Sequence, residues 1–70
     1  MLPHYQILGN NIRRLRVGMK LTQERLAEDA DLALRYIQEI EAGEKGPSLA
    51  ALLRIRKVLR CRWDNLLAKL

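Results

Sequence analysis

The sequence predicts an all-α fold in one small domain, and three observations carry that prediction. Residues 6–70 fall into five segments in which apolar residues recur every three or four positions, the spacing of an amphipathic helix. Thr22 and Ser48 stand where two of these segments begin, and hydroxyl residues are suited to cap a helix N-terminus. Gly43, at the end of the third segment, is a typical residue at a helix C-terminus.

The bulk composition is that of an ordinary globular chain. Seventy residues, 49% apolar and 30% charged, make one domain with a modest core. The longest apolar run, residues 49–53, is too short to cross a membrane, and the N-terminus lacks the pattern of a secretory signal. The single cysteine, Cys61, cannot form an internal disulfide and is expected to replace a buried aliphatic residue. A lone cysteine fits a reducing, cytoplasmic location.

The first helix is predicted over about Gln6 to Met19, after a loose tail of residues 1–5 and at the start of a domain of residues 6–70. Its core face is formed by residues at positions i, i+4, i+7 and i+11, which are Leu8, Ile12, Leu15 and Met19. Thr22 caps the second helix. The apolar residues of this helix fall within roughly a 100° arc, and they are Leu26, Ala27 and Ala30.

A tight turn at residues 31–33 leads into a third helix, predicted over about Leu34 to Ala42. Asp31 tolerates the left-handed conformation that a sharp turn requires better than most residues do. Ala33 stands in the N-cap position and forfeits about 1 kcal/mol of capping. Two isoleucines of this helix share a buried face, and the opposite face carries Leu34, Arg35, Gln38 and Glu39.

The fourth helix is predicted from its cap at Ser48 to about Arg60, and the fifth over about Trp63 to Ala68. Four residues form the predicted core stripe of the fourth helix: Leu49, Leu52, Ile55 and Leu59. Arg56 intrudes on that stripe. It is expected either to reach an acid such as Glu28 or Glu41, or to widen the packing.

Two short helices joined by a tight turn form the unit that places one helix in the major groove of DNA. The chain resembles the Cro and phage-repressor type of helix-turn-helix transcription regulators over about Leu8 to Leu67. The motifs are L-T-Q-E-x-L-A at residues 21–27, Y-I-x-x-I-E-x-G at residues 36–43 and P-S-L at residues 47–49. The resemblance implies a compact five-helix, lambda-repressor-like domain that binds double-stranded DNA as a homodimer. This chain departs from the family pattern at Asp31, Ala33 and Arg56.

The resemblance and the chemistry of base edges together indicate how the third helix would read DNA. Arg35 suits a guanine and Gln38 an adenine, whereas Glu39 accepts only from cytosine and Leu34 touches a thymine methyl. Expected phosphate contacts are Thr22, Gln23, Tyr36 and Lys45; for Tyr36, packing alone is an equal alternative.

The resemblance also implies two structural sites. Arg16 is expected to pair internally with Glu41, although its side chain can instead extend to water. The C-terminal region is expected to form the dimer interface through Trp63, Leu66, Leu67 and Leu70, the alternative being that all four pack inward.

Charge is the observation that complicates this reading. The chain has a net charge of +5, which favours a polyanionic partner, yet residues 24–44 hold seven acidic and only two basic residues. A second hypothesis is therefore a protein-interaction module, such as an antitoxin or an accessory partner of another chain. The sequence shows no catalytic pairing, metal-ligand cluster or phosphate loop, so neither enzyme activity nor a cofactor is expected.

Overall fold

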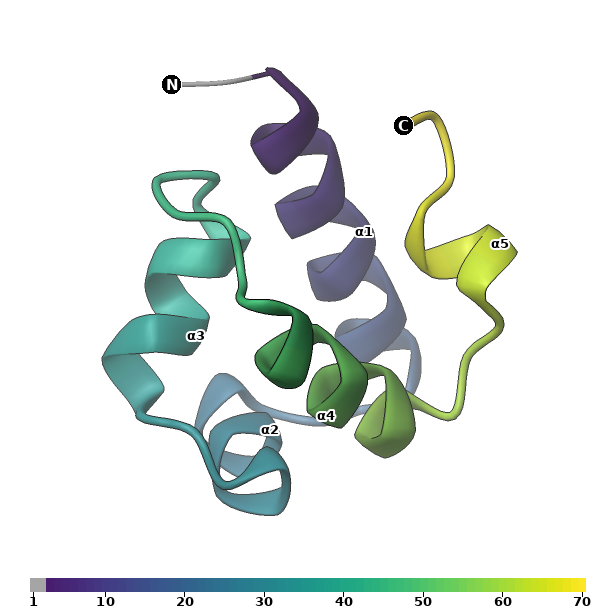
Figure 1. Ribbon diagram of the computed structural model, residues 1–70. Coiled ribbons are helices and arrows are strands. Elements are labelled where there is room, and N and C mark those ends of the chain that lie inside the picture. Colours follow the sequence, from purple (N-terminus) through teal and green to yellow (C-terminus); the bar gives the residue numbers. More distant parts are fainter. Residues whose placement is uncertain (1–2) are drawn as a thin grey trace.

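The computed structural model describes residues 3–70 and confirms the all-α prediction (Figure 1). The helices are α1 (Pro3–Gly18), α2 (Gln23–Ala30), α3 (Leu34–Glu41), α4 (Leu49–Leu59) and α5 (Trp63–Leu66). Residues 1–2 of the predicted tail lie outside the described range. The first helix begins at Pro3 and not at Gln6, because proline is well suited to the first turn of a helix. No helix within residues 3–70 is long and apolar enough to cross a membrane.

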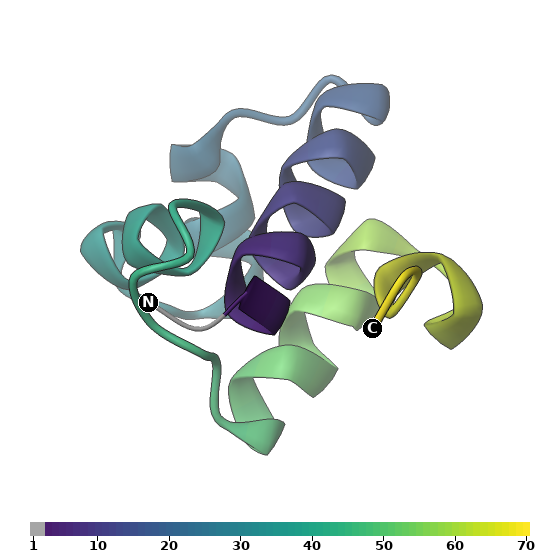
Figure 2. The same ribbon diagram turned by 90° about the horizontal axis from the view of Figure 1, so that it is seen from above.

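Helix α1 lies between α3 on one side and α5 on the other in both ribbon views (Figures 1 and 2). Helix α2 packs against both α3 and α4. The core that joins these helices is built from one or two aliphatic residues of each: Leu8, Ile12, Leu26, Ala27, Ile37, Ile40, Ile55, Leu59 and Leu66. The third helix is thereby held at the edge of the molecule, with its opposite face turned outward.

Gly9 decides how closely α3 approaches α1. Gly9 is buried, and a Cβ atom there would collide with the backbone carbonyl oxygens of Ile40 and Glu41. Glycine therefore lets the end of α3 lie directly against α1.

The prediction that Met19 belongs to the core face was wrong, because α1 ends at Gly18 and Lys20 turns the chain with a φ of 60°.

Asn11 is a buried polar residue that the apolar pattern did not reveal. Its Nδ2 donates to the carbonyl oxygens of Leu66 and Ala68, each at 2.9 Å. These bonds fasten the C-terminal segment to α1. The available signal was its position, since Asn11 lies three residues after Leu8 on the buried face and asparagine is a poor helix former.

Replacing Asn11 with alanine should lower the free energy of unfolding by about 1–3 kcal/mol, because a buried and a partly buried carbonyl oxygen lose their donor. Urea denaturation followed by circular dichroism measures this change. The matched control is Asn10→Ala, which makes the same substitution at an exposed position of α1. Equal losses for the two variants would contradict the role given to Asn11.

Helix α4 buries a different set of residues from the predicted stripe. Ile55 and Leu59 are buried as predicted, and Leu52 is partly buried. Leu49, however, is 71% exposed, and Ala51 takes its place in the core. The reason is local: Ser48 caps the helix by accepting a hydrogen bond from the Ala51 N–H, which leaves Leu49 in the outward part of the first turn.

Arg56 reaches neither of the acids named in the prediction. Its guanidinium carbon lies 4.8 Å from the centre of the Trp63 ring, so a cation–π contact joins α4 to α5. Its Nε is buried without a hydrogen-bond partner within the described residues. Stacking on an aromatic ring is how an arginine on a core-facing stripe is accommodated here.

Helix α5 divides its apolar residues between the interior and the surface. Leu66 is fully buried, so the prediction that it belongs to an interface was wrong. Trp63 packs partly against the core and keeps part of its surface exposed. Leu67 and Leu70 remain exposed. Of the four residues, Leu67 and Leu70 expose the largest fraction of their surface.

Candidate nucleic-acid interface

The turn between α2 and α3 has the geometry that the sequence predicted. Thr22 caps α2, and its hydroxyl accepts a hydrogen bond from the Arg25 N–H at 3.0 Å. Asp31 ends α2 in the left-handed conformation, with φ 56° and ψ 47°. Ala33 precedes α3 without a side-chain cap, as expected for alanine. This turn sets the angle at which α3 leaves α2.

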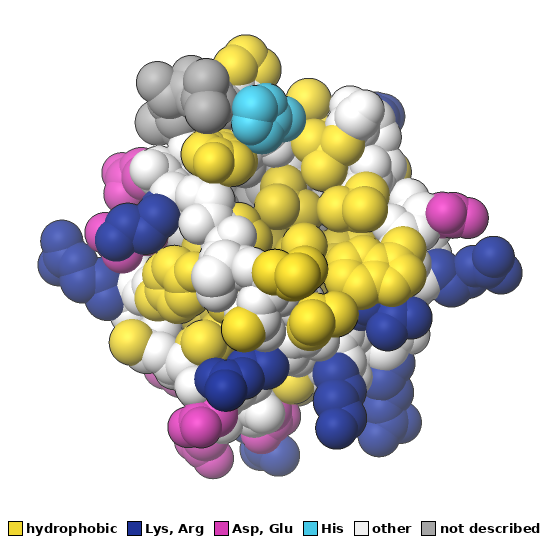
Figure 3. Space-filling view, viewed as in Figure 1, with side chains coloured by type: hydrophobic (Ala, Val, Ile, Leu, Met, Phe, Trp, Pro, Cys, Tyr) yellow, Lys and Arg dark blue, Asp and Glu magenta, His cyan; other side chains and the backbone are white. Residues whose placement is uncertain are grey.

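The outward face of α3 is open. The Arg35 side chain is 86% exposed, and Gln38 is exposed as well. Lys and Arg side chains project from the α3 side of the molecule (Figure 3). Leu34 is partly buried against the core, so less of it is available to a thymine methyl than the helix face alone implies.

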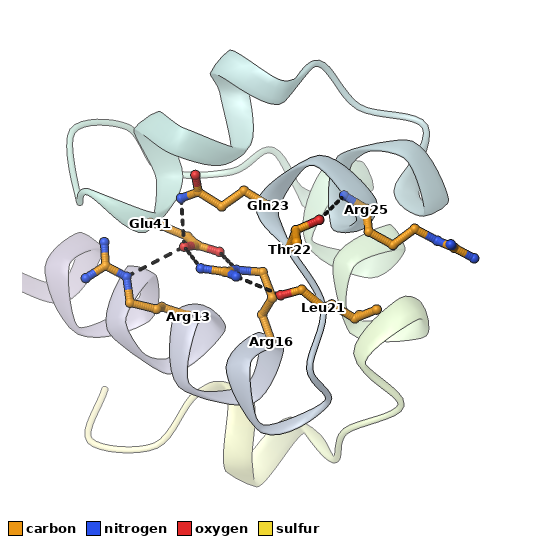
Figure 4. Close-up of polar contacts among 7 residues, drawn as sticks. All are labelled: Arg13, Arg16, Leu21, Thr22, Gln23, Arg25 and Glu41. Atoms are coloured by element: carbon orange, nitrogen blue, oxygen red, sulfur yellow. Dashed lines mark hydrogen bonds and ion pairs between the residues drawn. The ribbon is translucent and has the colours of Figure 1, made fainter.

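The buried carboxylate of Glu41 joins α1, α2 and α3 behind the outward face of α3. Arg16 Nε donates to Glu41 Oε2 at 2.7 Å and Arg16 Nη2 to Glu41 Oε1 at 3.0 Å (Figure 4). Arg16 Nη1 also donates to the carbonyl oxygen of Leu21 at 2.8 Å. The Glu41 side chain has no exposed surface. The structure thus brings the predicted pair together, and α1 is tied through it to the end of α3.

The same carboxylate holds the first residue of α2. Gln23 Nε2 donates to Glu41 Oε1 at 3.1 Å (Figure 4). A glutamine amide has two N–H donors, so one remains for a phosphate. Gln23 also stands at a helix N-terminus, where free backbone N–H groups and the helix dipole favour an anion. The sequence did not reveal that Gln23 is positioned by Glu41.

Arg13, an exposed cation of α1, also lies near this carboxylate. Its Nε lies 3.7 Å from Glu41 Oε1, and its side chain is 57% exposed. It therefore contacts the same carboxylate oxygen that Gln23 contacts, from the solvent-exposed side of the cluster (Figure 4). The pairing spans 28 positions of sequence, beyond the reach of any local pattern.

Tyr36 fixes the loop that follows α3. Its hydroxyl oxygen accepts a hydrogen bond from the Ser48 backbone N–H at 2.9 Å, and its ring packs partly against the core. The hydroxyl proton stays available to a phosphate, so both functions considered for Tyr36 are compatible. Lys45 lies in this loop, and its Nζ is 3.5 Å from Glu39 Oε1.

The acidic segment at residues 24–44 is partly neutralised by internal pairs. Arg25 Nε donates to both carboxylate oxygens of Asp29 at 3.0 Å, and these hydrogen bonds raise the pKa of Arg25 above its ordinary value. Arg25 is therefore already paired with Asp29 on α2. Of the two basic residues in this segment, Arg35 is the one that lies on the outward face of α3.

Among residues 3–70, no group of three His, Cys, Asp or Glu side chains is placed to hold a metal ion. Burial raises the pKa of the Cys61 thiol above its ordinary value, which keeps it protonated and a weak nucleophile at neutral pH.

An open cavity of about 500 Å³ between α2 and α4 is lined by charges of both signs, among them Asp29, Asp31, Arg54 and Lys57.

The fold, the turn and the open face of α3 together define a DNA-binding domain of the helix-turn-helix class. The profile of the helix-turn-helix family matches residues 12–66, and the chain belongs to this family. Members of the family are DNA-binding transcription regulators. The resemblance to helix-turn-helix regulators that was predicted from the motifs at residues 21–49 is therefore confirmed.

Two relatives show where in the family the chain lies. It is 34% identical over 64 residues to the control protein C.SmaI of Serratia marcescens, covering 91% of this chain and 76% of that protein. Its fold matches the crystal structure of the restriction-modification controller protein C.AhdI from Aeromonas hydrophila with a TM-score of 0.84. The sequence identity to C.AhdI is 29%, over 89% of this chain and 94% of that chain.

Proposed function

We propose that the protein binds a specific double-stranded DNA operator and regulates transcription of a restriction-modification system. The observation that carries the proposal is the outward face of α3, where Arg35 is 86% exposed on a helix that Glu41 ties to α1 and α2. The similarity to the controller proteins C.SmaI and C.AhdI supports the system it would regulate. Such a regulator acts where the DNA lies, in the cytoplasm, and needs no cofactor.

In this proposal α3 enters the major groove and the flanking elements hold phosphates. Arg35 and Gln38 meet base edges, with Leu34 at the border of the same face. Thr22 and Gln23, at the start of α2, and Tyr36 and Lys45, beside the loop, contact the backbone on either side. Selection of preferred sites from random duplexes, followed by binding at several salt concentrations, tests this arrangement. Selection without any enriched sequence would refute it.

We further propose a symmetric homodimer that reads two half-sites about 34 Å apart. Its interface is assigned to the exposed leucines of α4 and of the C-terminal segment, namely Leu49, Leu53, Leu67 and Leu70. Hydrophobic side chains gather over α4 and toward α5 on the face seen in Figure 3. An exposed apolar surface of this kind is typical of a protein–protein interface.

Replacing Leu53 with glutamate should convert the dimer to a monomer, because a carboxylate would then be buried against apolar side chains of the second subunit. Leu53 is 47% exposed in the single chain, so the substitution leaves the core intact. Sedimentation velocity measures the outcome, and Lys57→Glu, one turn further along α4 at an exposed position, is the control. A Leu53→Glu protein that still sediments as a dimer would place the interface elsewhere.

The alternative is a protein-interaction module, such as an antitoxin or accessory partner, and the acidity of α2 is the observation that favours it. Glu24 and Glu28 are both exposed on α2 and would repel a phosphate backbone. Arg35 and Lys45 offset this acidity on the α3 side, which is why DNA binding is preferred. A chain that selects no DNA sequence and co-purifies stoichiometrically with one basic protein would favour the alternative.

A further inference from the structure

One acidic residue lies between the two exposed cations of the proposed DNA surface. Arg35 Nε is 3.8 Å from Glu39 Oε2, and Lys45 Nζ is 3.5 Å from Glu39 Oε1. The side chains of Arg35 and Lys45 are 86% and 56% exposed, whereas that of Glu39 is only 25% exposed. The carboxylate therefore lies behind the two cations, in contact with each, and extends less far into solvent than they do.

From this arrangement we propose that Glu39 determines specificity by restraining Arg35 and Lys45, and does not itself read a base. The proposal rests on the DNA-binding function proposed above and replaces the cytosine contact expected from the sequence. In it, Glu39 competes with every phosphate for both cations. It thereby weakens binding to DNA of arbitrary sequence more than binding to the operator.

The backbone holds Lys45 and Glu39 near each other. The Glu44 N–H donates to the Glu39 carbonyl oxygen at 3.0 Å, which places the loop directly after the end of α3. The hydrogen bond from the Ser48 N–H to the Tyr36 hydroxyl oxygen closes the far end of that loop against the same helix. Lys45, between these two fastenings, remains within reach of Glu39.

The Arg35 pair follows from helix geometry. Residues four apart in a helix lie one above the other, so Arg35 and Glu39 share one side of α3. Exposed pairs at these distances are weak and readily exchanged for a better partner. A guanine edge is such a partner, because it accepts two hydrogen bonds from one guanidinium in a fixed geometry.

The operator and DNA of other sequences therefore differ in the contacts that they offer to Arg35 once its pair with Glu39 breaks. At the operator, the bidentate contact of Arg35 replaces the Glu39 pair. On other sequences Arg35 can pair only with phosphates. The Glu39 carboxylate repels these phosphates when the helix approaches the DNA backbone. A repulsive element that acts mainly against the wrong partner raises the ratio of specific to nonspecific affinity.

The test is Glu39→Gln, which removes the charge and keeps the shape of the side chain. Affinity for a random duplex should rise about tenfold, the factor expected when two exposed pairs and one phosphate repulsion are removed. Affinity for the selected operator should rise less, so the specificity ratio falls. The plot of log affinity against log salt should steepen by about one phosphate contact on the random duplex. Fluorescence anisotropy at four salt concentrations measures all three quantities, after circular dichroism has shown that the variant is folded.

Two further variants separate a specific restraint from a general change of charge. Glu44→Gln makes the same charge change at an exposed position of the loop that follows α3, and it should alter the ratio far less. In a Lys45→Ala background, the gain produced by Glu39→Gln on random DNA should shrink, since one of the restrained cations is gone.

Three outcomes would overturn the proposal. An equal change of the specificity ratio in Glu44→Gln would show that Glu39 acts only through its contribution to the net charge. An unchanged specificity ratio would leave it a solvated residue. A loss of affinity confined to operators with cytosine at one position would make it a base reader after all. If the unaltered protein binds no duplex, the proposed function itself fails, which distinguishes that failure from these three.

Discussion

Replacing Glu41 with glutamine should lower the free energy of unfolding by about 3–5 kcal/mol, the cost of leaving a buried charge without its partner. Arg16 donates two hydrogen bonds to this carboxylate at 2.7 and 3.0 Å, and the Glu41 side chain has no exposed surface. Glutamine has the same shape, so packing is preserved while the charge that balances Arg16 is lost. Urea denaturation with a two-state fit measures the change.

The control for this experiment is Glu44→Gln, three residues further on and exposed. Its effect should be within the few tenths of a kcal/mol typical of surface substitutions, roughly 0.5 kcal/mol at most. If the two variants unfold at the same urea concentration, the Arg16–Glu41 pair contributes nothing to stability and the account of the buried cluster is wrong. The effect of Glu41→Gln should also reach DNA binding, because Gln23 would lose the acceptor that positions its amide.

Replacing Arg35 with alanine should weaken binding to the selected operator by about 1–3 kcal/mol and relax the preference at one base position. The reason is the loss of a bidentate contact that only one base edge returns. Site selection repeated with the variant identifies the position, and anisotropy titrations give the affinity. Because the Arg35 side chain is 86% exposed and its ion pair with Glu39 is long, at 3.8 Å, the fold should be unaffected.

Arg25→Ala is the matched control for Arg35→Ala, because it removes an arginine that is already committed to Asp29 on α2. It should leave the base preference unchanged. An Arg35→Ala protein that loses the same affinity on every sequence would show that Arg35 holds a phosphate and reads no base. The proposed orientation of α3 in the groove would then have to be revised.

Signals that act over a few residues predicted most of the fold. The caps at Thr22 and Ser48, the left-handed Asp31 and the uncapped Ala33 all have the geometry expected from residue type. Each depends on the chemistry of one side chain and the backbone groups next to it. The motifs at residues 21–49 identified the helix-turn-helix family for the same reason, since they flank the turn between α2 and α3.

Patterns of apolar spacing were less reliable at the ends of helices. Met19 and Leu49 lie on the predicted core faces but are exposed: Met19 follows the last residue of α1, and Leu49 is the first residue of α4. Leu66 shows the reverse: it was assigned to a surface interface and is fully buried. Periodicity says which residues share a face but not what that face meets.

The sequence by itself determined the five helices, their caps and the helix-turn-helix family, because these depend on residues within about four positions of one another. Only the tertiary structure decided where the other polar groups meet. Asn11 donates to the Leu66 carbonyl oxygen across 55 positions, and Arg56 contacts the Trp63 ring rather than an acid. The Arg16–Glu41 pair, 25 positions apart, was expected from the family resemblance and not from any local pattern. These contacts depend on the packing of α1 against α3 and α5, and no local pattern of hydrophobicity or charge specifies that packing.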